Sequence, residues 1–272
     1  MTPIRRQSPT PAILLEIEEN VAIVTLNRPE KRNAIDPPMA AALEAAIDRI
    51  ENDPTIRVGI LRAEVTRDRP VFCAGHDLTH FRESFGTPDE DAVTTATGGF
   101  AGITRKPRRK PLIAAVDGLA TSGGCEIALA CDIILASRRA AFALAEVRWN
   151  LVPTAGGAFR LPRIVGRNVA MDAILTAEPI SAVRAYHLGL ISRLTSSANL
   201  DAMARQVATK IASHAPMAMR LARDIVDRAA TLDDAGAWRA LDEAAREVRN
   251  SRDLQEGLAA FWRKRSPNWA DQ

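Results

Sequence analysis

Short apolar runs alternate, as far as residue 195, with segments whose apolar residues recur every three or four positions. The runs have the Val, Ile and Leu content of buried strands; they cover residues 13–19, 21–27, 56–62, 71–75, 111–116, 133–136 and 190–195, with short extended pieces near 141–144. Helical spacing covers residues 39–50, 168–175 and 182–188, and Asp36 and Pro37 suit the start of the first helix. Strands that alternate with helices predict an α/β fold with mainly parallel pairing.

The pattern changes near residue 200, because no further strand is evident and amphipathic helices follow, separated near residues 216, 232 and 251. We therefore expect an N-terminal tail (1–12), an α/β core (13–197) and a helical C-terminal subdomain for oligomerisation (198–272). Residues 83–99 are polar, contain Gly and Thr and are weakly periodic, which favours a mobile lid.

We expect the core to be organised around residues 111–132. A buried strand leads to the adjacent glycines Gly123 and Gly124, and helix-forming residues follow. A glycine turn at a helix start presents backbone N–H groups that no helical carbonyl uses, and the helix dipole adds positive potential. Such a turn suits an oxyanion. Glu126, expected one or two residues inside the helix, is either a capping carboxylate or a chemical one.

Composition narrows the class of protein. The 272 residues are 47% apolar and 25% charged, and a net charge of +3 is too small to indicate nucleic-acid binding, although it is compatible with a small anionic substrate. No apolar run could span a bilayer, and residues 1–11 lack the apolar stretch of a signal peptide. Cys73, Cys125 and Cys131 form no CxxC motif, which indicates free thiols in a reducing cytoplasm.

One alternative site is a zinc centre. His76 and His80 have the spacing of an HExxH helix, with Asp77 in place of the glutamate. No third ligand is evident, and an aspartate is short for the usual general base, so this interpretation has little support.

A second alternative is a serine hydrolase. Residues 120–124 (ATSGG) approximate the nucleophile elbow, and His187 or His214 could supply a base. The first residue of the motif is Ala rather than Gly, and Asp117 and Gly118 separate the motif from the preceding strand. These departures count against this function.

Four stretches, in matching order and spacing, resemble the crotonase superfamily, the enoyl-CoA hydratase/isomerase family. They are residues 26–34 (LNRPEKRNA), 72–78 (FCAGHDL), 117–132 (DG…GGCE…CD) and 142–162 (FALAEV…LVPTAGG…RLP). Each motif alone is weak evidence. Together they imply an α/β fold built as a crotonase-like spiral of β-β-α turns. They also imply a C-terminal helical subdomain that helps to form a homotrimer or a dimer of trimers.

The resemblance implies an acyl-CoA thioester as substrate, with neither nucleic acid nor membrane as partner. In this family two backbone N–H groups bind the thioester oxygen, and the matching groups belong to His76 and Gly123. The physics agrees, because a thioester enolate carries charge on oxygen and one preorganised donor contributes about 3 kcal/mol.

Two glutamates at the positions of Glu126 and Glu146 catalyse hydration in this family. We assign water activation for attack at C3 to Glu126 and proton transfer at C2 to Glu146. Isomerases of the family commonly keep only the second, and carnitinyl-CoA-like dehydratases are related, so both remain alternatives. A catalytically silent acyl-CoA binding protein is a third, against which both glutamates argue. No metal or cofactor is expected, since coenzyme A is part of the substrate.

Further residues are assigned to substrate binding by the same resemblance. Arg28 and Lys31 match the region of the CoA phosphates, although a structural ion pair would explain them almost as well. An aromatic and a basic residue of the tail lie near acyl-CoA in this family, often from a neighbouring subunit. The full set of substrate-binding residues is Arg28, Lys31, Ala34, Ala74, Asp77, Leu78, Trp149, Trp262 and Lys264.

The chain also departs from the family pattern. His76 replaces a small residue, Thr121-Ser122 stand where Leu-Gly is common, and Ala145 stands where Pro usually precedes the second glutamate. Trp149-Asn150 replace an aliphatic or basic residue and a glycine; Asn tolerates the left-handed backbone that Gly would adopt. These changes leave the acyl group and the preferred direction of hydration open.

Overall fold

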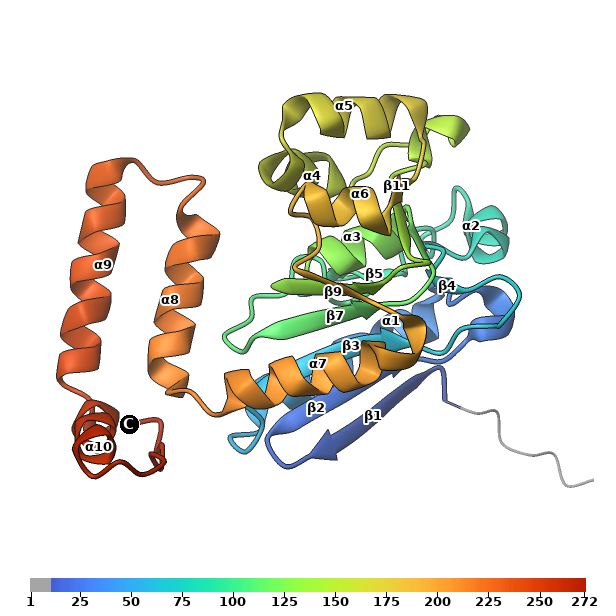
Figure 1. Cartoon of the computed structure of the whole chain (residues 1–272). Coiled ribbons are helices and arrows are strands. Elements are labelled where there is room, and N and C mark those ends of the chain that lie inside the picture. Colours follow the sequence, from blue (N-terminus) through green and yellow to red (C-terminus); the bar gives the residue numbers. More distant parts are fainter. Residues whose placement is uncertain (1–10) are drawn as a thin grey trace, which may run out of the picture.

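A six-stranded sheet forms the base of the computed structural model, which describes residues 11–272 (Figure 1). Most of the predicted N-terminal tail therefore lies outside the described residues. The strand order is β1-β2-β3-β7-β9-β12; β1 is antiparallel to β2 and the other pairs are parallel. The strands are β1 (Ile13–Glu18), β2 (Val21–Leu26), β3 (Val58–Ala63), β7 (Leu112–Val116), β9 (Ile133–Ser137) and β12 (Arg193–Thr195).

A second sheet has the order β11-β10-β8-β4, in which β4, β8 and β10 are parallel. Its strands are β4 (Val71–Cys73), β8 (Leu119–Thr121), β10 (Ala141–Ala143) and β11 (Ile180–Ser181), and a separate hairpin joins β5 (Thr94–Thr95) to β6 (Gly99–Phe100). Thr121 pairs with Ala143, so β8 and β10 end side by side. The segments that follow parallel strands consequently leave the sheet at one edge.

Helices cover both sheets. They are α1 (Pro37–Asn52), α2 (Leu78–Ser84), α3 (Gly123–Leu129), α4 (Gly157–Val165), α5 (Arg167–Thr176), α6 (Ala182–His187), α7 (Ser197–Ala212), α8 (Pro216–Arg228), α9 (Asp234–Arg249) and α10 (Arg252–Trp262), with 3-10 turns η1 (Pro29–Lys31) and η2 (Glu146–Trp149). Asp36 caps α1 by accepting a hydrogen bond from the N–H of Met39, as predicted.

The larger sheet is buried on both faces. Alternate residues of β2, such as Ala22 and Val24, join the main core with α1, whereas Val21 and Ile23 join a second cluster with Leu200 and other residues of α7. The strand period of two sends successive side chains to opposite faces. Burial of both faces explains the continuous apolar runs of the sequence.

The helical tail divides into two parts. Helix α7 lies on the large sheet, and α8, α9 and α10 project away from it at the left of Figure 1. The division of the chain at residue 198 stays a prediction, but α7 packs with the core. Within residues 11–272, no helix has the length and apolar character needed to cross a membrane.

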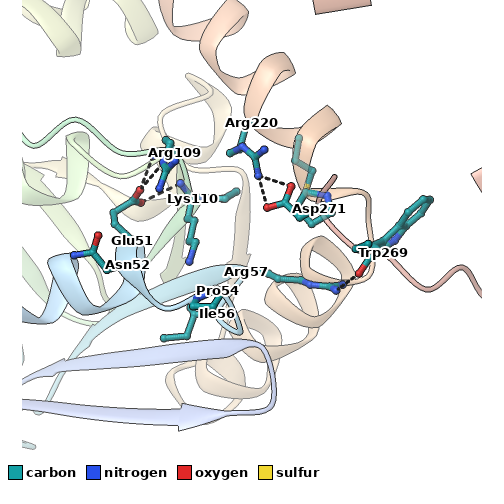
Figure 2. A pocket seen from close by; sticks show the side chains of 14 residues that line it. Glu51, Asn52, Pro54, Ile56, Arg57, Arg109, Lys110, Arg220, Trp269 and Asp271 are labelled. Atoms are coloured by element: carbon teal, nitrogen blue, oxygen red, sulfur yellow. Dashed lines mark hydrogen bonds and ion pairs between the residues drawn. The ribbon is translucent and has the colours of Figure 1, made fainter. Parts of the chain in front are cut away.

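The final residues bind the tail back to the core. Asp253 accepts hydrogen bonds from the N–H groups of Ala270 and Asp271, and the indole of Trp269 donates to the carbonyl of Ser213. A pocket of about 430 Å³ lies between this segment, the end of α1 and residues 109–111. Its cations already have partners in the chain: Arg220 binds Asp271, and Arg57 donates to the Trp269 carbonyl (Figure 2).

The strands and helices expected up to residue 195 are confirmed, with shorter bounds for β3 and β12. The sequence pattern missed β8, β11, α2 and the two short strands β5 and β6 at the end of the predicted lid. The position of Glu126 was also wrong. Because α3 begins at Gly123, Glu126 is its fourth residue rather than its first or second.

Candidate active site

Two turns meet at the edge of the second sheet. One follows β4 and contains Gly75 and His76, and the other joins β8 to α3 and contains Gly123. Gly75 has φ of +88°, and a Cβ there would lie 2.9 Å from the nitrogen of Gly123, so only glycine permits this approach. Neither the N–H of His76 nor that of Gly123 donates to an acceptor within residues 11–272. Neighbouring free N–H groups can bind an oxyanion.

Glycines also fix the second turn. A Cβ at Gly124 would collide with the carbonyl group of Cys73, so glycine at this position lets α3 pack closely against β4. A Cβ at Gly123 would collide with the Phe100 ring, so this aromatic side chain packs directly on the turn. The N–H of Ser122 donates to the Ala143 carbonyl at 2.8 Å, which ties the turn to β10.

Glu126 is a buried carboxylate with a defined partner. Its side chain is 3% exposed, and its Oε1 accepts a hydrogen bond from the Gly157 N–H at 2.8 Å. Burial, together with the charge of Glu146, raises the pKa of Glu126 to about 7, although the hydrogen bond from the Gly157 N–H opposes the shift. A carboxylate with a pKa near 7 can accept or donate a proton at neutral pH.

Glu146 is buried without a partner. It begins η2, is 8% exposed, and neither carboxylate oxygen has a hydrogen bond within the described residues. Burial raises its pKa as well. A buried carboxylate without a donor is costly to the fold, and such groups are rare in native structures. This exception is explained if Glu146 serves a ligand or a water molecule held between it and Glu126.

The His76 imidazole lies in an aromatic cluster beside the oxyanion turn. Its ring centroid is 5.2 Å from that of Phe81 and 6.4 Å from that of Phe100, and its Nε2 is 3.4 Å from Nδ1 of His80. Burial lowers the pKa of His76, with a contribution from His80. Within residues 11–272 no third Cys, His, Asp or Glu joins this pair to form a metal-binding group.

The C-terminal end of the segment expected to be a mobile lid, residues 83–99, is bound to α1 by hydrogen bonds. The Glu44 carboxylate accepts hydrogen bonds from the hydroxyls of Thr95 (2.9 Å) and Thr97 (2.6 Å) and from Lys106 (3.2 Å). A Cβ at Gly102 would collide with Glu44, so the loop packs closely on the helix. These contacts hold Phe100 in place beside Gly123.

The predicted CoA-binding residues between positions 28 and 78 differ in their contacts and in their exposure to solvent. Arg28 forms ion pairs with Asp36 (3.0 Å) and Asp77 (3.3 Å), which joins the 26–36 segment to the turn after Gly75. Asp77 also caps α2 through the Thr79 N–H. The other members of this group are Ala34, which is buried, Ala74, which is half-buried, and the exposed residues Lys31 and Leu78.

The predicted aromatic contacts lie at the surface. Trp149 ends η2 and is 70% exposed, and Asn150 after it has φ of 59°, which confirms the expected left-handed backbone. Trp262 ends α10, is 78% exposed, and is followed closely by Lys264. In Figure 1, α10 lies far from α3, so neither Trp262 nor Lys264 reaches Glu126 of its own chain.

Sequence reasoning missed two contributors to the site. Gly157 was seen as a turn residue, yet its N–H orients Glu126. Arg160 donates to the carbonyls of Ala155 and Thr104, and its charge lowers the pKa of Glu126. The glycine pair before α4 was a sequence signal for Gly157. Arg160 had no such signal beyond its place in the RLP motif.

Fold and site together define an α/β protein in which two buried carboxylates follow neighbouring strands of the second sheet. The family model for enoyl-CoA hydratase/isomerase matches residues 16–272. The chain belongs to this family, within the crotonase superfamily, and its fold is of the crotonase type.

Individual relatives agree. A short-chain-enoyl-CoA hydratase of Clostridium acetobutylicum is 35% identical over 93% of this chain and 95% of its own. An (E)-benzylidenesuccinyl-CoA hydratase of Thauera aromatica is 36% identical over 94% of this chain and 97% of its own. The crystal structure of an enoyl-CoA hydratase from Mycobacterium marinum has a TM-score of 0.89 at 34% identity, covering 97% of this chain and all of that one.

The raised pKa of Glu126 makes stability depend on pH. The folded chain holds this proton more tightly than an unfolded glutamate with a pKa of 4.5, so stability is lost as pH rises through about 7. Glu126→Gln cannot ionise and keeps the acceptor for Gly157. Measured by urea unfolding, the free energy of unfolding of this variant should exceed that of wild type by on the order of 3 kcal/mol near pH 8.5 and by little near pH 4.

The exposed residue Glu83 provides the control, because Glu83→Gln should follow the wild-type curve at both pH values. Protein concentration is held fixed, since any oligomer adds its own stability. A stability difference for Glu126→Gln that is equal at both pH values would contradict a buried, ionising Glu126.

Proposed function

We propose that the protein is an enoyl-CoA hydratase, which adds water reversibly across the 2,3 double bond of an enoyl-CoA thioester. The observation that carries the proposal is the pair of buried, mutually interacting carboxylates, one oriented by Gly157 and one without a partner. They follow the neighbouring parallel strands β8 and β10, and the N–H groups of His76 and Gly123, which have no acceptor in the described part of the chain, follow strands of the same sheet. The names of the relatives support the same reaction.

The residues divide the work by their environments. The N–H groups of His76 and Gly123 bind the thioester oxygen and stabilise the enolate as it forms. Glu126, oriented through Oε1, removes a proton from the water that attacks C3. Glu146 delivers a proton to C2 when the enolate collapses. These steps need no further cofactor, because the thioester itself makes the C2 position acidic.

Isomerase and dehydratase chemistry are the alternatives within the family. One relative, from Proteus mirabilis, is a carnitinyl-CoA dehydratase, 35% identical to this chain. Retention of Glu126 together with Glu146 favours hydration over isomerisation. We further propose a cytoplasmic location, which the three free thiols support.

The apolar side chains of α10 support assembly. Phe261 and Trp262 are 72% and 78% exposed, and Leu258 on the same helix is 53% exposed. Large exposed apolar groups in one region mark an interaction surface. We propose a homotrimer or a dimer of trimers in which α10 brings Trp262 and Lys264 to the acyl-CoA site of a neighbouring subunit.

The two glutamates test the reaction. Glu126→Gln and Glu146→Gln keep shape and hydrogen bonding but remove proton transfer, so each should lose at least about 10²-fold in turnover of crotonyl-CoA. The affinity for the CoA thioester should change little, and the double variant should be far from additive. Loss of the conjugated enoyl absorbance measures the rate.

The same assay separates the alternatives. A Glu126→Gln variant that still shifts a double bond, beside an inactive Glu146→Gln, would make the enzyme an isomerase. Hydration at wild-type rates by both variants would show that these glutamates are not the catalysts.

The oxyanion site is tested at His76. His76→Pro deletes the N–H and should lower turnover of crotonyl-CoA by roughly 10²-fold or more. His76→Ala keeps the N–H and should lose far less. Circular dichroism and thermal unfolding check that both variants fold. An equal collapse in the Ala variant would assign the chemistry to the imidazole instead of the backbone.

Assembly is tested by light scattering at micromolar concentration, which should give three or six times the mass of one chain. Replacing Trp262 by Ala should then raise KM for acyl-CoA. A stable monomer with full activity would contradict the shared site.

A further inference from the structure

The peptide group that carries the His76 N–H is held through its carbonyl. This carbonyl belongs to Gly75, and it accepts a hydrogen bond from the Ile35 N–H at 2.7 Å. In a planar trans peptide the C=O and N–H bonds point in opposite directions. The hydrogen bond from Ile35 therefore directs the His76 N–H away from Ile35, to the side where it has no acceptor within residues 11–272.

The peptide group of Ile35 is held in the same way by a side chain. Its carbonyl belongs to Ala34, and it accepts a hydrogen bond from Nη1 of Arg28 at 2.7 Å. Two peptide groups in series thus connect the Arg28 guanidinium to the His76 N–H. Hydrogen bonds in such a chain polarise one another, so this arrangement both orients the last N–H and strengthens it as a donor.

Further contacts bind the turn after β4 to the same early segment. The Asp77 N–H donates to the Ile35 carbonyl at 2.9 Å. The Ala74 N–H donates to the Arg32 carbonyl at 3.1 Å. Nη2 of Arg28 pairs with the Asp77 carboxylate at 3.3 Å. Arg28 thus contacts both the peptide chain that ends at the His76 N–H and the residue that follows it.

The surroundings of Arg28 disfavour the phosphate-binding role that the sequence suggested. Its side chain is 17% exposed, and the guanidinium is also 3.0 Å from the Asp36 carboxylate. One cation and the two carboxylates of Asp36 and Asp77 give the group a formal charge of −1, which repels a phosphate. The donors of Arg28 are directed to acceptors of its own chain.

We propose that Arg28 is a positioning residue for the reaction: through the Ala34 and Gly75 carbonyls, it aims the His76 N–H at the thioester oxygen without touching the substrate. The inference rests on the proposed function, in which this N–H stabilises the enolate. Without Arg28 the two peptide groups can tilt. A tilted donor is a weaker one, because hydrogen bonds weaken steeply with angle.

The first readout is the spectrum of a bound conjugated thioester, 2,4-hexadienoyl-CoA. A donor on the carbonyl oxygen stabilises the charge that excitation moves there, so the absorbance of the thioester shifts to longer wavelength. Wild type should show this red shift. At saturating thioester, Arg28→Gln should keep less than about half of it, because its N–H is misaligned.

The second readout separates positioning from phosphate binding. Arg28→Gln should lower kcat for crotonyl-CoA by about tenfold, less than the loss of a whole donor, and should leave KM nearly unchanged. CoA itself carries the phosphates but no thioester oxygen, so its Kd by calorimetry should stay within about twofold. A phosphate ligand would instead weaken CoA binding and leave the red shift intact at saturation.

Two further variants complete the test. Arg82→Gln removes an exposed arginine from α2, close to the turn, and should match wild type in every readout. Arg28→Lys keeps the charge but has one nitrogen for three acceptors, so its red shift should lie between those of wild type and Arg28→Gln. Circular dichroism checks folding, and Arg28→Lys decides the question if Arg28→Gln does not fold.

A wild-type protein that binds 2,4-hexadienoyl-CoA without a red shift would overturn the proposal, as would a full red shift in a folded Arg28 variant. Hydration of crotonyl-CoA is scored separately. A wild type that shows the red shift but hydrates nothing would overturn the proposed hydratase function alone, and the spectra of the variants would still decide the role of Arg28.

Discussion

The close approach of two backbone turns is the constraint on which the site depends. The segment after β4 and the segment before α3 touch through Gly75, Gly123 and Gly124, where added side chains would collide with backbone or with Phe100. This contact brings together the turns that carry the N–H groups of His76 and Gly123, which have no acceptor within residues 11–272. It also fixes the start of α3, and hence the position of Glu126 on that helix. A side chain at Gly75 or Gly124 would displace these two N–H groups and the Glu126 carboxylate together.

The two glutamates carry an electrostatic cost that this packing makes possible. Burial favours the neutral forms of Glu126 and Glu146, and each ionised form would repel the other. Among the residues that the structure describes, only the Glu126 side chain accepts a hydrogen bond, from the N–H of Gly157. The resulting difference in environment suits a pair in which one group removes a proton while the other supplies one. A surface pair of carboxylates would both stay ionised and could not share the roles in this way.

The fold was largely predictable from the sequence because its strands are buried on both faces and appear as continuous apolar runs. The glycines and both glutamates could be assigned through the four family motifs. Contacts between residues that are far apart in the sequence could not be predicted in this way. The Glu44 carboxylate binds Thr95 and Thr97 some fifty positions later, and nothing in either segment indicates this pairing. The three-residue strand β8 was missed because Leu119, Ala120 and Thr121 form no run distinct from their neighbours.

Two of the departures from the family pattern lie at the turns after β4 and before α3, and their effects differ in kind. His76 keeps its backbone N–H, the group that the family motif requires of it, and adds an imidazole among Phe81, Phe100 and His80. Ser122 instead places a side chain where the backbone favours glycine. Ser122→Gly should therefore stabilise the fold, because glycine adopts this backbone conformation without strain.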